Sequence, residues 1–503
     1  MCFLIKSDKM CSMNAIIEQL RKEENCRENL SKLRELVKTN ERKAQCIQVE
    51  GYAELFAHFL DSEDAKTRKN AALLLGDLAC QNQMNTLLAH YQNETTEFVK
   101  GAYLEALAKL DVTEILDQLM KLLEQLSDTE ITVENRKHME AQMRPLRSIQ
   151  LKYQGKKVHR MVPHPKGKVI LTCNREVREV LRRSITSGRA TAHPLGVLVE
   201  CEDLHQITAN RLYRELLFPV SVKGLLEPDP DVVAEALWNA DILGQLLELH
   251  GEEGPYSFRI ELKSSMGLDK KSIFTKRMAG ALERMSKGQL LNSTTDYEVE
   301  LRLVANKEGK LYPCMKLKTV PQHRFYYRKN SIAASIHPAT AAVIMELAQP
   351  YMKEHAQIMD PFCGVGTMLI ERHKKLPARQ IYGTDIYGEA IEKARENAAL
   401  AGVNINYIHR DFFDFKHEYL FDEMITNMPI RGKKTKEEMD TFYGQFFDKV
   451  SQHMAPGGVI IMYTNEEGFV KKQLRLHENM KLLDQYLMQE KNGFYLMIME
   501  IRG

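Results

Sequence analysis

The stretch Ile358-Met-Asp360-Pro-Phe-Cys-Gly364-Val-Gly366-Thr367 sets how the C-terminal part of this chain folds. Its apolar start predicts a strand, and the residues after Thr367 predict a helix over Met368–Lys374. A Gly-x-Gly turn between a strand and a helix lets the backbone approach a bound ligand closely, because glycine has no side chain. The sequence therefore predicts a strand–turn–helix unit with a ligand-binding turn.

Further strands follow this unit, and each of them carries a polar residue at its end. They are predicted over 381–385, 405–412 and 421–427, with Asp385, Asp411 and Asn427 at their ends. A helix over Glu389–Ala401 separates the first two. Because alternating strands and helices build a doubly wound parallel sheet, we expect these polar side chains to gather at one edge.

The strand ends indicate a nucleoside cofactor. A carboxylate placed like Asp385 can accept hydrogen bonds from both ribose hydroxyls. The Gly-x-Gly-x-x-Gly pyrophosphate fingerprint is missing, since Leu369 stands at its last position, which disfavours NAD and FAD. The apolar runs Leu482–Gln489 and Phe494–Ile501, joined across Asn492-Gly493, predict a terminal antiparallel hairpin, whereas an ordinary dinucleotide domain ends in parallel strands.

Residues 320–503 resemble the THUMP-containing RNA methyltransferases that modify the exocyclic amine of guanine in tRNA or 23S rRNA. The matching stretches are Arg324-Phe-Tyr-Tyr-Arg328, Ser335-Ile-His-Pro-Ala-Thr-Ala-Ala342, Asp360–Thr367, Gly383-Thr-Asp385, Glu389–Asn397, Asn427-Met-Pro-Ile430 and Met454-Ala-Pro-Gly-Gly458. The resemblance implies a Rossmann-like α/β methyltransferase domain over 319–503 with a C-terminal antiparallel hairpin. It also implies S-adenosyl-L-methionine as the cofactor and structured RNA as the partner.

The resemblance assigns roles to individual residues. Asp360 would face the methionyl ammonium, Asp385 the ribose, and Asp411 with the Phe412 backbone the adenine. The cofactor-binding set would be Asp360, Phe362, Cys363, Gly364, Gly366, Thr367, Asp385, Ile386, Asp411 and Phe412. The catalytic set would be Asn427, Met428 and Pro429, in which the Asn427 side chain and the Met428 carbonyl accept hydrogen bonds from the target amine. Such acceptors orient the amine for in-line methyl transfer. We expect no metal site in this domain.

The chain departs from its relatives at the catalytic motif, which is usually Asn/Asp-Pro-Pro-aromatic and here reads Asn-Met-Pro-Ile. Ile430 cannot stack on an extruded base as an aromatic ring would, and such stacking contributes about 1–3 kcal/mol. Candidates to replace the missing ring are Phe362, Phe412, Phe413, Phe442 and Tyr443. Candidates to contact the RNA phosphates are Arg324, Arg328, Arg431, Lys433 and Lys434.

Residues 151–318 predict an α+β region with mostly antiparallel strand pairing, including a helix over 204–217 and one helix ending near His250. Ser257–Lys318 resembles a THUMP domain, an RNA-binding module, although a generic βαββ unit has the same pattern. Residues 151–200 contain 11 Lys or Arg against 3 Asp or Glu, and residues 201–256 contain 3 against 11. The basic stretches fit either a phosphate-binding surface or solvated faces.

Residues 1–126 predict an all-helical domain. Asp64–Ala79 and Glu97–Leu110 resemble the second helices of HEAT repeats, which bury their apolar faces by stacking into a short solenoid. A plain helical bundle is the alternative, and a protein partner is a candidate occupant of the repeats. Residues 127–150 predict a helical linker.

Composition limits the remaining classes. The chain has 503 residues, 44% hydrophobic and 27% charged, with a net charge of +2. Nine cysteines without a Cys-x-x-Cys pair fit a reducing cytoplasm. We expect no membrane span, because no apolar run reaches about 18 residues, and no secretory signal in the opening stretch. Alternatives to RNA methylation are a non-catalytic RNA-binding protein that keeps the fold, a methyltransferase for DNA adenine or a protein amide, and a partner-docking scaffold.

Overall fold

The computed structural model of the chain describes residues 13–129, 132, 134–153 and 158–502. Residues 1–12, which carry most of the stretch tested for a secretory signal, lie outside the described residues. The chain divides into two compact units: Met1–His159, Val222–Leu247 and Glu252–Tyr312 form the first, and Arg160–Ser221, Glu248–Gly251 and Pro313–Gly503 form the second. The region predicted as one α+β domain, residues 151–318, is therefore shared between the units. No helix among the described residues is long and apolar enough to cross a bilayer.

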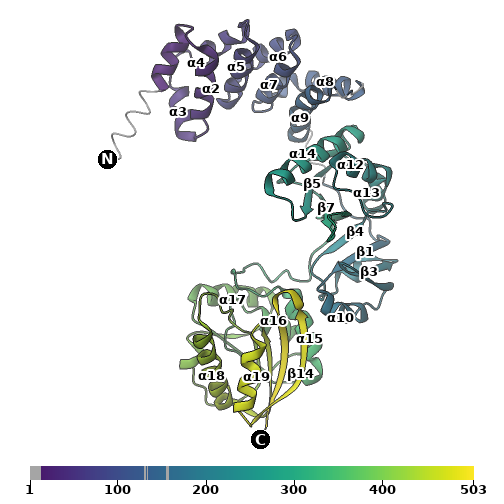
Figure 1. Cartoon of the computed structure of the whole chain (residues 1–503), viewed down its shortest axis with the longest axis vertical. Helices are drawn as coiled ribbons and strands as arrows, with labels where there is room; N and C mark the ends of the chain where they lie inside the picture. The colour runs from purple at the N-terminus through teal and green to yellow at the C-terminus, as the bar shows by residue number, and fades with distance from the viewer. Residues whose placement is uncertain (1–12, 130–131, 133, 154–157, 503) are drawn as a thin grey trace. The chain divides into compact units, whose positions relative to one another are not determined.

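The first unit begins with an all-helical region, drawn in purple to blue in Figure 1. Its helices are α2 (Cys26–Leu36), α3 (Asn40–Ile47), α4 (Tyr52–His58), α5 (Ala65–Asp77), α6 (Met84–Asn93), α7 (Glu97–Leu107), α8 (Leu116–Asp128) and α9 (Arg136–Tyr153). Asp64 starts α5 by accepting hydrogen bonds from the N–H groups of Lys66 and Thr67 at 3.3 and 3.0 Å. Helix α7 approaches α5 closely, because a Cβ on Gly76 of α5 would lie 2.5 Å from the Cα of Ala106 in α7. The buried leucines and alanines of these helices form one continuous core.

Helix α9 occupies most of the predicted linker and packs against α7 and α8. Met143, Leu146 and Ile149 on its inner face belong to the helical core. Its polar side chains bind the α/β part of the same unit: Arg136 pairs with Asp231 at 2.5 Å, and Arg147 with Glu283 at 3.4 Å. The segment thus holds the helical region to α12 and α14 of the first unit.

The α/β part of the first unit contains α12 (Pro230–Asn239), α13 (Ile242–His250), β5 (Tyr256–Lys263), α14 (Leu268–Met285), β6 (Leu290–Asn292), β7 (Val299–Ala305) and the start of β8 (Leu311–Leu317). The single helix predicted to end near His250 is two helices, separated at Asp241, whose φ is 52°. Strand β5 pairs in parallel with both β6 and β7, whereas the other described strand pairs of residues 151–318 are antiparallel, so the prediction of mostly antiparallel pairing is confirmed. Parallel pairing follows because α14 carries the chain back across the sheet between β5 and β6.

The second unit begins with β1 (Gly167–Thr172), α10 (Arg178–Arg183), β2 (Arg189–His193), β3 (Gly196–Cys201), α11 (Leu204–Thr208) and β4 (Leu216–Pro219). These strands pair antiparallel, as predicted. The predicted helix over 204–217 is wrong beyond Thr208. Leu216 and Leu217 instead pair with Leu171 and Ile170 of β1, where they are buried, so long-range pairing in the sheet decides the structure of this segment.

The C-terminal part of the second unit is a seven-stranded sheet in the order β11-β10-β9-β12-β13-β15-β14. Its strands are β9 (Gln357–Asp360), β10 (Gln380–Asp385), β11 (Asn406–His409), β12 (Phe421–Asn427), β13 (Met454–Thr464), β14 (Met480–Gln489) and β15 (Phe494–Ile501). All neighbours from β11 to β13 run parallel, and β15 is antiparallel to both β13 and β14. The predicted doubly wound sheet with a terminal antiparallel hairpin is confirmed.

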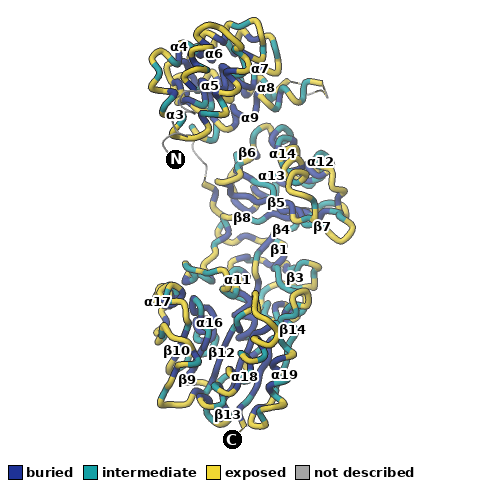
Figure 2. Tube along the Cα trace, turned by 60° about the vertical axis from the view of Figure 1, so that its left-hand side comes forward, coloured by how far each residue is buried: buried dark blue, intermediate teal, exposed yellow. Residues whose placement is uncertain are grey.

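Helices α15 (Pro338–Ala348), α16 (Thr367–Lys375) and α17 (Gly388–Ala401) pack beside one another, and α18 (Lys436–His453) packs with α19 (Glu467–Leu476) (Figure 1). Strands β9, β12 and β13 run through the middle of this part as mostly buried segments (Figure 2). The carboxyl ends of β9, β10, β11 and β12 therefore meet at one edge of a buried sheet, where the predicted site residues lie.

A fully buried ion pair joins α16 to the central strand β12. The Arg372 guanidinium donates two hydrogen bonds of 2.7 Å to the Glu423 carboxylate, and neither side chain is exposed. Lys353 completes the cluster, because its carbonyl accepts from Arg372 and its N–H donates to Glu423 at 2.6 Å. Such a pair is balanced only while both charges are present.

We expect Glu423→Gln to destabilise the C-terminal sheet by about 3–5 kcal/mol, because it leaves the buried Arg372 charge uncompensated. Hydrogen exchange of peptides from α16 and β12 measures the change. The control is Glu389→Gln, which removes a carboxylate that is 80% exposed and pairs with Lys393, and should leave the exchange of both peptides unchanged. Equal exchange in the two variants would contradict the assignment.

Candidate active site

The turn between β9 and α16 is tied to the neighbouring strand. The Cys363 N–H donates to the Thr384 carbonyl of β10 at 2.9 Å, and the Gly366 N–H donates to the Cys363 carbonyl at 2.8 Å. The Phe362 N–H donates to the Asp360 carboxylate at 3.0 Å. These bonds hold the Gly-x-Gly turn in one shape over the carboxyl ends of the strands.

Gly366 is the residue on which the turn depends. It precedes α16 with a φ of 80°, and a Cβ at this position would lie 2.0 Å from the Tyr407 hydroxyl of β11. That hydroxyl and the Thr367 hydroxyl are both buried, and neither makes a hydrogen bond with a described residue. Buried polar groups normally have partners, so these two hydroxyls are candidates to hydrogen-bond a polar ligand beside the turn.

Asp385, at the end of β10, connects the turn to the following helix. One of its carboxylate oxygens accepts from the Gly364 N–H at 2.9 Å, and the other from the Tyr387 N–H at 2.9 Å. Each oxygen keeps a second lone pair for a ligand. Ile386, beside it, is 55% exposed and offers an apolar surface. The arrangement fits a ribose with an adjoining adenine ring.

Asp411 and Phe412 follow β11. The Asp411 side chain is exposed and accepts from the Phe413 N–H at 3.0 Å, which starts a short 3-10 turn. The Phe412 ring is buried against Phe362 and Phe446, at centroid distances of 6.0 and 5.9 Å. The Phe412 N–H donates to no described residue, so it is available to an acceptor on a ligand ring.

Asn427, Met428 and Pro429 lie at the end of β12, the strand next to β9. Asn427 pairs with Tyr463 of β13, and the Met428 N–H donates to the Tyr463 carbonyl at 2.9 Å. The Met428 side chain is buried, whereas Ile430 is 59% exposed. No hydrogen bond joins the Asn427 side chain to a described residue, so its amide is free to bind a substrate group.

Burial, together with the nearby Asp385 carboxylate, raises the pKa of the Asp360 carboxyl to about 8. Asp360 is 1% exposed, so its charged form lacks water. Burial also raises the pKa of the neighbouring Cys363 thiol well above its usual range, which keeps that thiol protonated and unreactive. A buried acid beside a second acid is suited to a cationic ligand group.

The aromatic candidates divide by burial. Phe412 and Tyr443 are buried in the core, where the Tyr443 hydroxyl bonds Thr464 at 2.7 Å. Phe362, Phe413 and Phe442 are only partly buried and contact one another: Phe442 lies 5.6 Å from each of the other two rings. Of the five candidates, these three could present a ring face to a base.

The five cations predicted to contact RNA also differ in burial. Arg324 is buried, and its guanidinium lies 3.5 Å from the Tyr213 ring centre and donates to the carbonyls of Tyr213 and Arg214. The prediction that Arg324 contacts RNA is therefore corrected: its charge is used inside the second unit. Arg328 is half-buried and donates to the Ile336 carbonyl at 3.1 Å. The exposed cations of the set are Arg431, Lys433 and Lys434.

Sequence reasoning does not single out Asn397 or Tyr407. The Asn397 side chain is fully buried and donates to the Val365 carbonyl of the turn at 3.1 Å. It also accepts from the Asn330 N–H at 3.1 Å, which connects the segment before α15 to the turn. Asn397 ends the stretch Glu389–Asn397 that resembles the family, so that pattern contains the only signal.

The family described as "RMKL-like, methyltransferase domain" matches residues 326–490. This stretch is a methyltransferase domain dependent on S-adenosylmethionine. A tRNA (guanine(10)-N2)-dimethyltransferase of Methanothermobacter thermautotrophicus is 28% identical over 164 residues, which are 31% of this chain. The chain covers 48% of the length of that relative.

Two solved structures have the same fold as a larger part of the chain. TrmN from Thermus thermophilus superposes with a TM-score of 0.51 at 20% identity, covering 66% of this chain and 99% of its own. SMU.472 complexed with SAH gives a TM-score of 0.50 at 16% identity, covering 67% and 98%. Two thirds of the chain is more than the methyltransferase domain alone, so the shared architecture extends beyond that domain.

The raised pKa of Asp360 predicts a pH dependence. In the empty site the carboxyl holds a proton that the unfolded chain has released, so stability falls as pH rises from about 4 to about 8. A bound ammonium favours the charged form, so binding S-adenosylmethionine releases this proton, and the affinity for S-adenosylmethionine rises as pH rises toward about 8. Calorimetry in buffers of different ionisation enthalpy counts the proton. Asp360→Asn should bind more weakly and release none, and an unchanged proton count would contradict the role of Asp360.

Gly366→Ala should weaken cofactor binding at least about tenfold, because the new Cβ meets the Tyr407 hydroxyl and displaces the turn. Gly402→Ala is the matched control: Gly402 has a φ of 69°, but a Cβ added there would meet no described atom within 4 Å, so the change adds backbone strain without a clash. Calorimetric titration with S-adenosylmethionine measures both variants. Equal affinity in the two would show that the turn does not line the cofactor site.

Proposed function

We propose that the chain transfers a methyl group from S-adenosylmethionine to the exocyclic amine of a guanine in structured RNA, either tRNA or 23S rRNA. The observation that carries this proposal is the position of Asn427 and Met428 at the end of β12, next to the strand that ends in Asp360. Neighbouring parallel strands bring their ends together, so an amine at Asn427 and a methyl donor held at Asp360 are close to each other.

Residues of this chain contribute to the transfer by orienting the target amine. S-adenosylmethionine supplies a methyl group on a sulfonium, which is a strong electrophile without acid catalysis. The Asn427 side-chain oxygen and the Met428 carbonyl accept hydrogen bonds from the two amine hydrogens and aim the nitrogen lone pair. They also stabilise the positive charge that develops on nitrogen. The hydrogen bond from Met428 to Tyr463 holds this peptide in place.

The choice of guanine in RNA draws on the relatives and on the charge of the chain. The relative from Methanothermobacter is named for methylation of a guanine in tRNA, and it is similar over 164 residues of this chain. Arg431, Lys433 and Lys434 follow the catalytic motif as exposed cations and are proposed to bind phosphates. A target base would leave its helix to reach the site.

A non-catalytic RNA-binding protein is the second candidate, and Ile430 is the observation that favours it. The residue is exposed where related enzymes carry an aromatic ring. Phe442 and Phe413 are partly exposed rings in this part of the chain that could stack on the base instead, and Lys434 lies 4.8 Å from the Phe442 ring centre.

The test incubates the full chain with labelled S-adenosylmethionine and cellular tRNA or ribosomal RNA, followed by nucleoside analysis. The expected product is N2-methylguanosine or its dimethylated form. Label in DNA adenine or in a protein amide would replace the proposal with another methyltransferase. Cofactor binding with no transfer to any of these acceptors would favour the RNA-binding candidate.

Asn427→Ala should lower the rate of transfer roughly 10²–10³-fold, because one of two acceptors on the amine is lost. Its affinity for S-adenosylmethionine should stay within about twofold, since the cofactor contacts proposed here come from other strands. The control Asn404→Ala removes an exposed amide before β11 and should leave the rate unchanged. Unchanged transfer by Asn427→Ala would remove Asn427 from the mechanism.

A further inference from the structure

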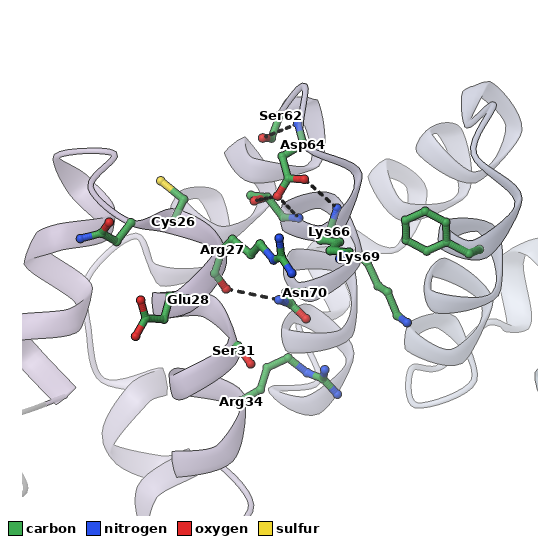
Figure 3. Close-up of a pocket in the computed structure, with 13 residues that line it drawn as sticks. Cys26, Arg27, Glu28, Ser31, Arg34, Ser62, Asp64, Lys66, Lys69 and Asn70 are labelled. Atoms are coloured by element: carbon green, nitrogen blue, oxygen red, sulfur yellow. Dashed lines mark hydrogen bonds between the residues drawn. The ribbon is translucent and has the colours of Figure 1, made fainter.

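A groove on the helical region is lined by several basic side chains. It has a volume of about 1030 Å³ and lies between the first turns of α2 and α5 and the start of α7. Figure 3 shows Arg27 on α2 and Lys66 and Lys69 on α5 around this groove. All three helices belong to the first unit, so the groove is complete within one folded part.

The charges of the groove do not cancel. Of its two acidic residues, Glu28 pairs with Lys32 at 2.6 Å. The other, Asp64, accepts from the backbone at the start of α5, and its pKa is lowered by the Thr67 hydroxyl and also by the charge of Arg27, so Asp64 offsets part of that charge. Arg27, Lys66 and Lys69 form no ion pair with any residue in the described part of the chain. The first turns of α2 and α5 add the positive ends of two helices. The groove therefore presents an excess of positive charge.

Three other basic residues of this region, Arg68, Lys100 and Arg34, form ion pairs with described residues, unlike Arg27, Lys66 and Lys69. Arg68 pairs with Glu94 at 2.7 Å, and Lys100 pairs with Glu97 at 2.8 Å. Arg34, at the end of the groove, pairs with Asp77 at 3.2 Å. A ligand that enters the groove thus meets three cations that no ion pair among the described residues neutralises.

An exposed aromatic ring stands beside these cations. Phe98, the second residue of α7, is 40% exposed, and the Lys69 ammonium lies 5.9 Å from its ring centre. Cations that follow a backbone together with a ring on which a base can stack are the features by which proteins hold single-stranded nucleic acid. An acidic peptide would use the cations but would leave the ring without a planar partner.

We propose that this groove binds a single-stranded segment of RNA, with Arg27, Lys66 and Lys69 on successive phosphates and Phe98 against a base. The identity of the partner as RNA rests on the proposed function, whereas the site is separate from the methyltransferase domain. The groove gives the helical region a direct part in substrate binding.

The experiment measures binding rather than methylation. Fluorescence anisotropy follows a labelled oligouridylate on the full chain and on the variant Arg27→Ala/Lys66→Ala/Lys69→Ala across a range of salt concentrations. The control Arg21→Ala/Lys22→Ala/Lys38→Ala removes the same charge from the helical region outside the groove lining. A labelled oligoglutamate of matching charge is the rival ligand.

We expect the groove variant to bind the RNA at least about tenfold more weakly and to lower the salt slope by about 2, as the loss of three phosphate contacts on a single strand requires. Phe98→Ala should weaken binding about 5–100-fold while leaving the slope unchanged, because stacking releases no counterions. The control variant should match the wild type. In the wild type, RNA should protect Lys66 and Lys69 from chemical acetylation, which keeps the test open if the triple variant does not fold.

Equal RNA binding by the groove variant and the control, or acetylation of Lys66 and Lys69 that RNA does not reduce, would overturn the proposal. Tighter binding of oligoglutamate than of oligouridylate would overturn it in favour of an acidic protein partner. These outcomes are distinguishable from failure of the proposed function: methyl transfer to RNA that persists when groove binding fails rejects only the groove. Groove binding without any methyl transfer rejects only the enzymatic proposal.

Discussion

The almost complete burial of the Asp360 carboxyl, at the end of the central strand β9, is the constraint on which the site depends. The hydrogen bonds of the turn around it follow from this burial. Burial favours its neutral form, so the protein gains nothing from its charge until a cation arrives. Hydrogen bonds fix the backbone around this carboxyl. The Phe362 N–H donates to the Asp360 carboxyl, and the Cys363 N–H donates to a carbonyl of β10. The site is therefore organised before any ligand binds, which lowers the entropy cost of binding.

The same turn is held from a second direction by Asn397 of α17, which also bonds the segment that precedes α15. Asn397 bonds the Val365 carbonyl and the Asn330 backbone, and farther along this segment Tyr327 bonds Glu371 of α16. Glu371 also receives two hydrogen bonds from Arg211, at 2.6 and 3.0 Å, in the small antiparallel part of the second unit. A continuous set of polar contacts thus runs from that part to the proposed cofactor turn.

The parts of the fold and of the site that the sequence predicts are those that depend on residues close together in the chain. Strands β9, β10 and β12 and the terminal hairpin follow from local apolar runs bounded by glycine, aspartate or asparagine, and the structure has them close to the predicted residues. The sequence predicts helix at β4, and only the partners of Leu216 and Leu217 on β1 make this segment a strand. It predicts Arg324 on the surface for the same reason: the three carbonyls that Arg324 bonds, of Asn210, Tyr213 and Arg214, lie more than a hundred positions away.

The amino-acid sequence is sufficient for the order of strands and helices in the C-terminal half and for the polar residues that end each strand, since both depend on neighbours in the chain. It also contains the Asn-Met-Pro-Ile motif and its missing ring. Which side chains remain free for ligands follows from tertiary packing alone. The Tyr407 hydroxyl lies beneath Gly366, the Asn427 amide has no partner among the described residues, and the cations Arg27, Lys66 and Lys69 meet in one groove, although α2 and α5 are separate in sequence. A polar or charged side chain is available to a ligand only if no residue distant in the sequence packs against it as a partner. The tertiary structure alone decides which residues become such partners.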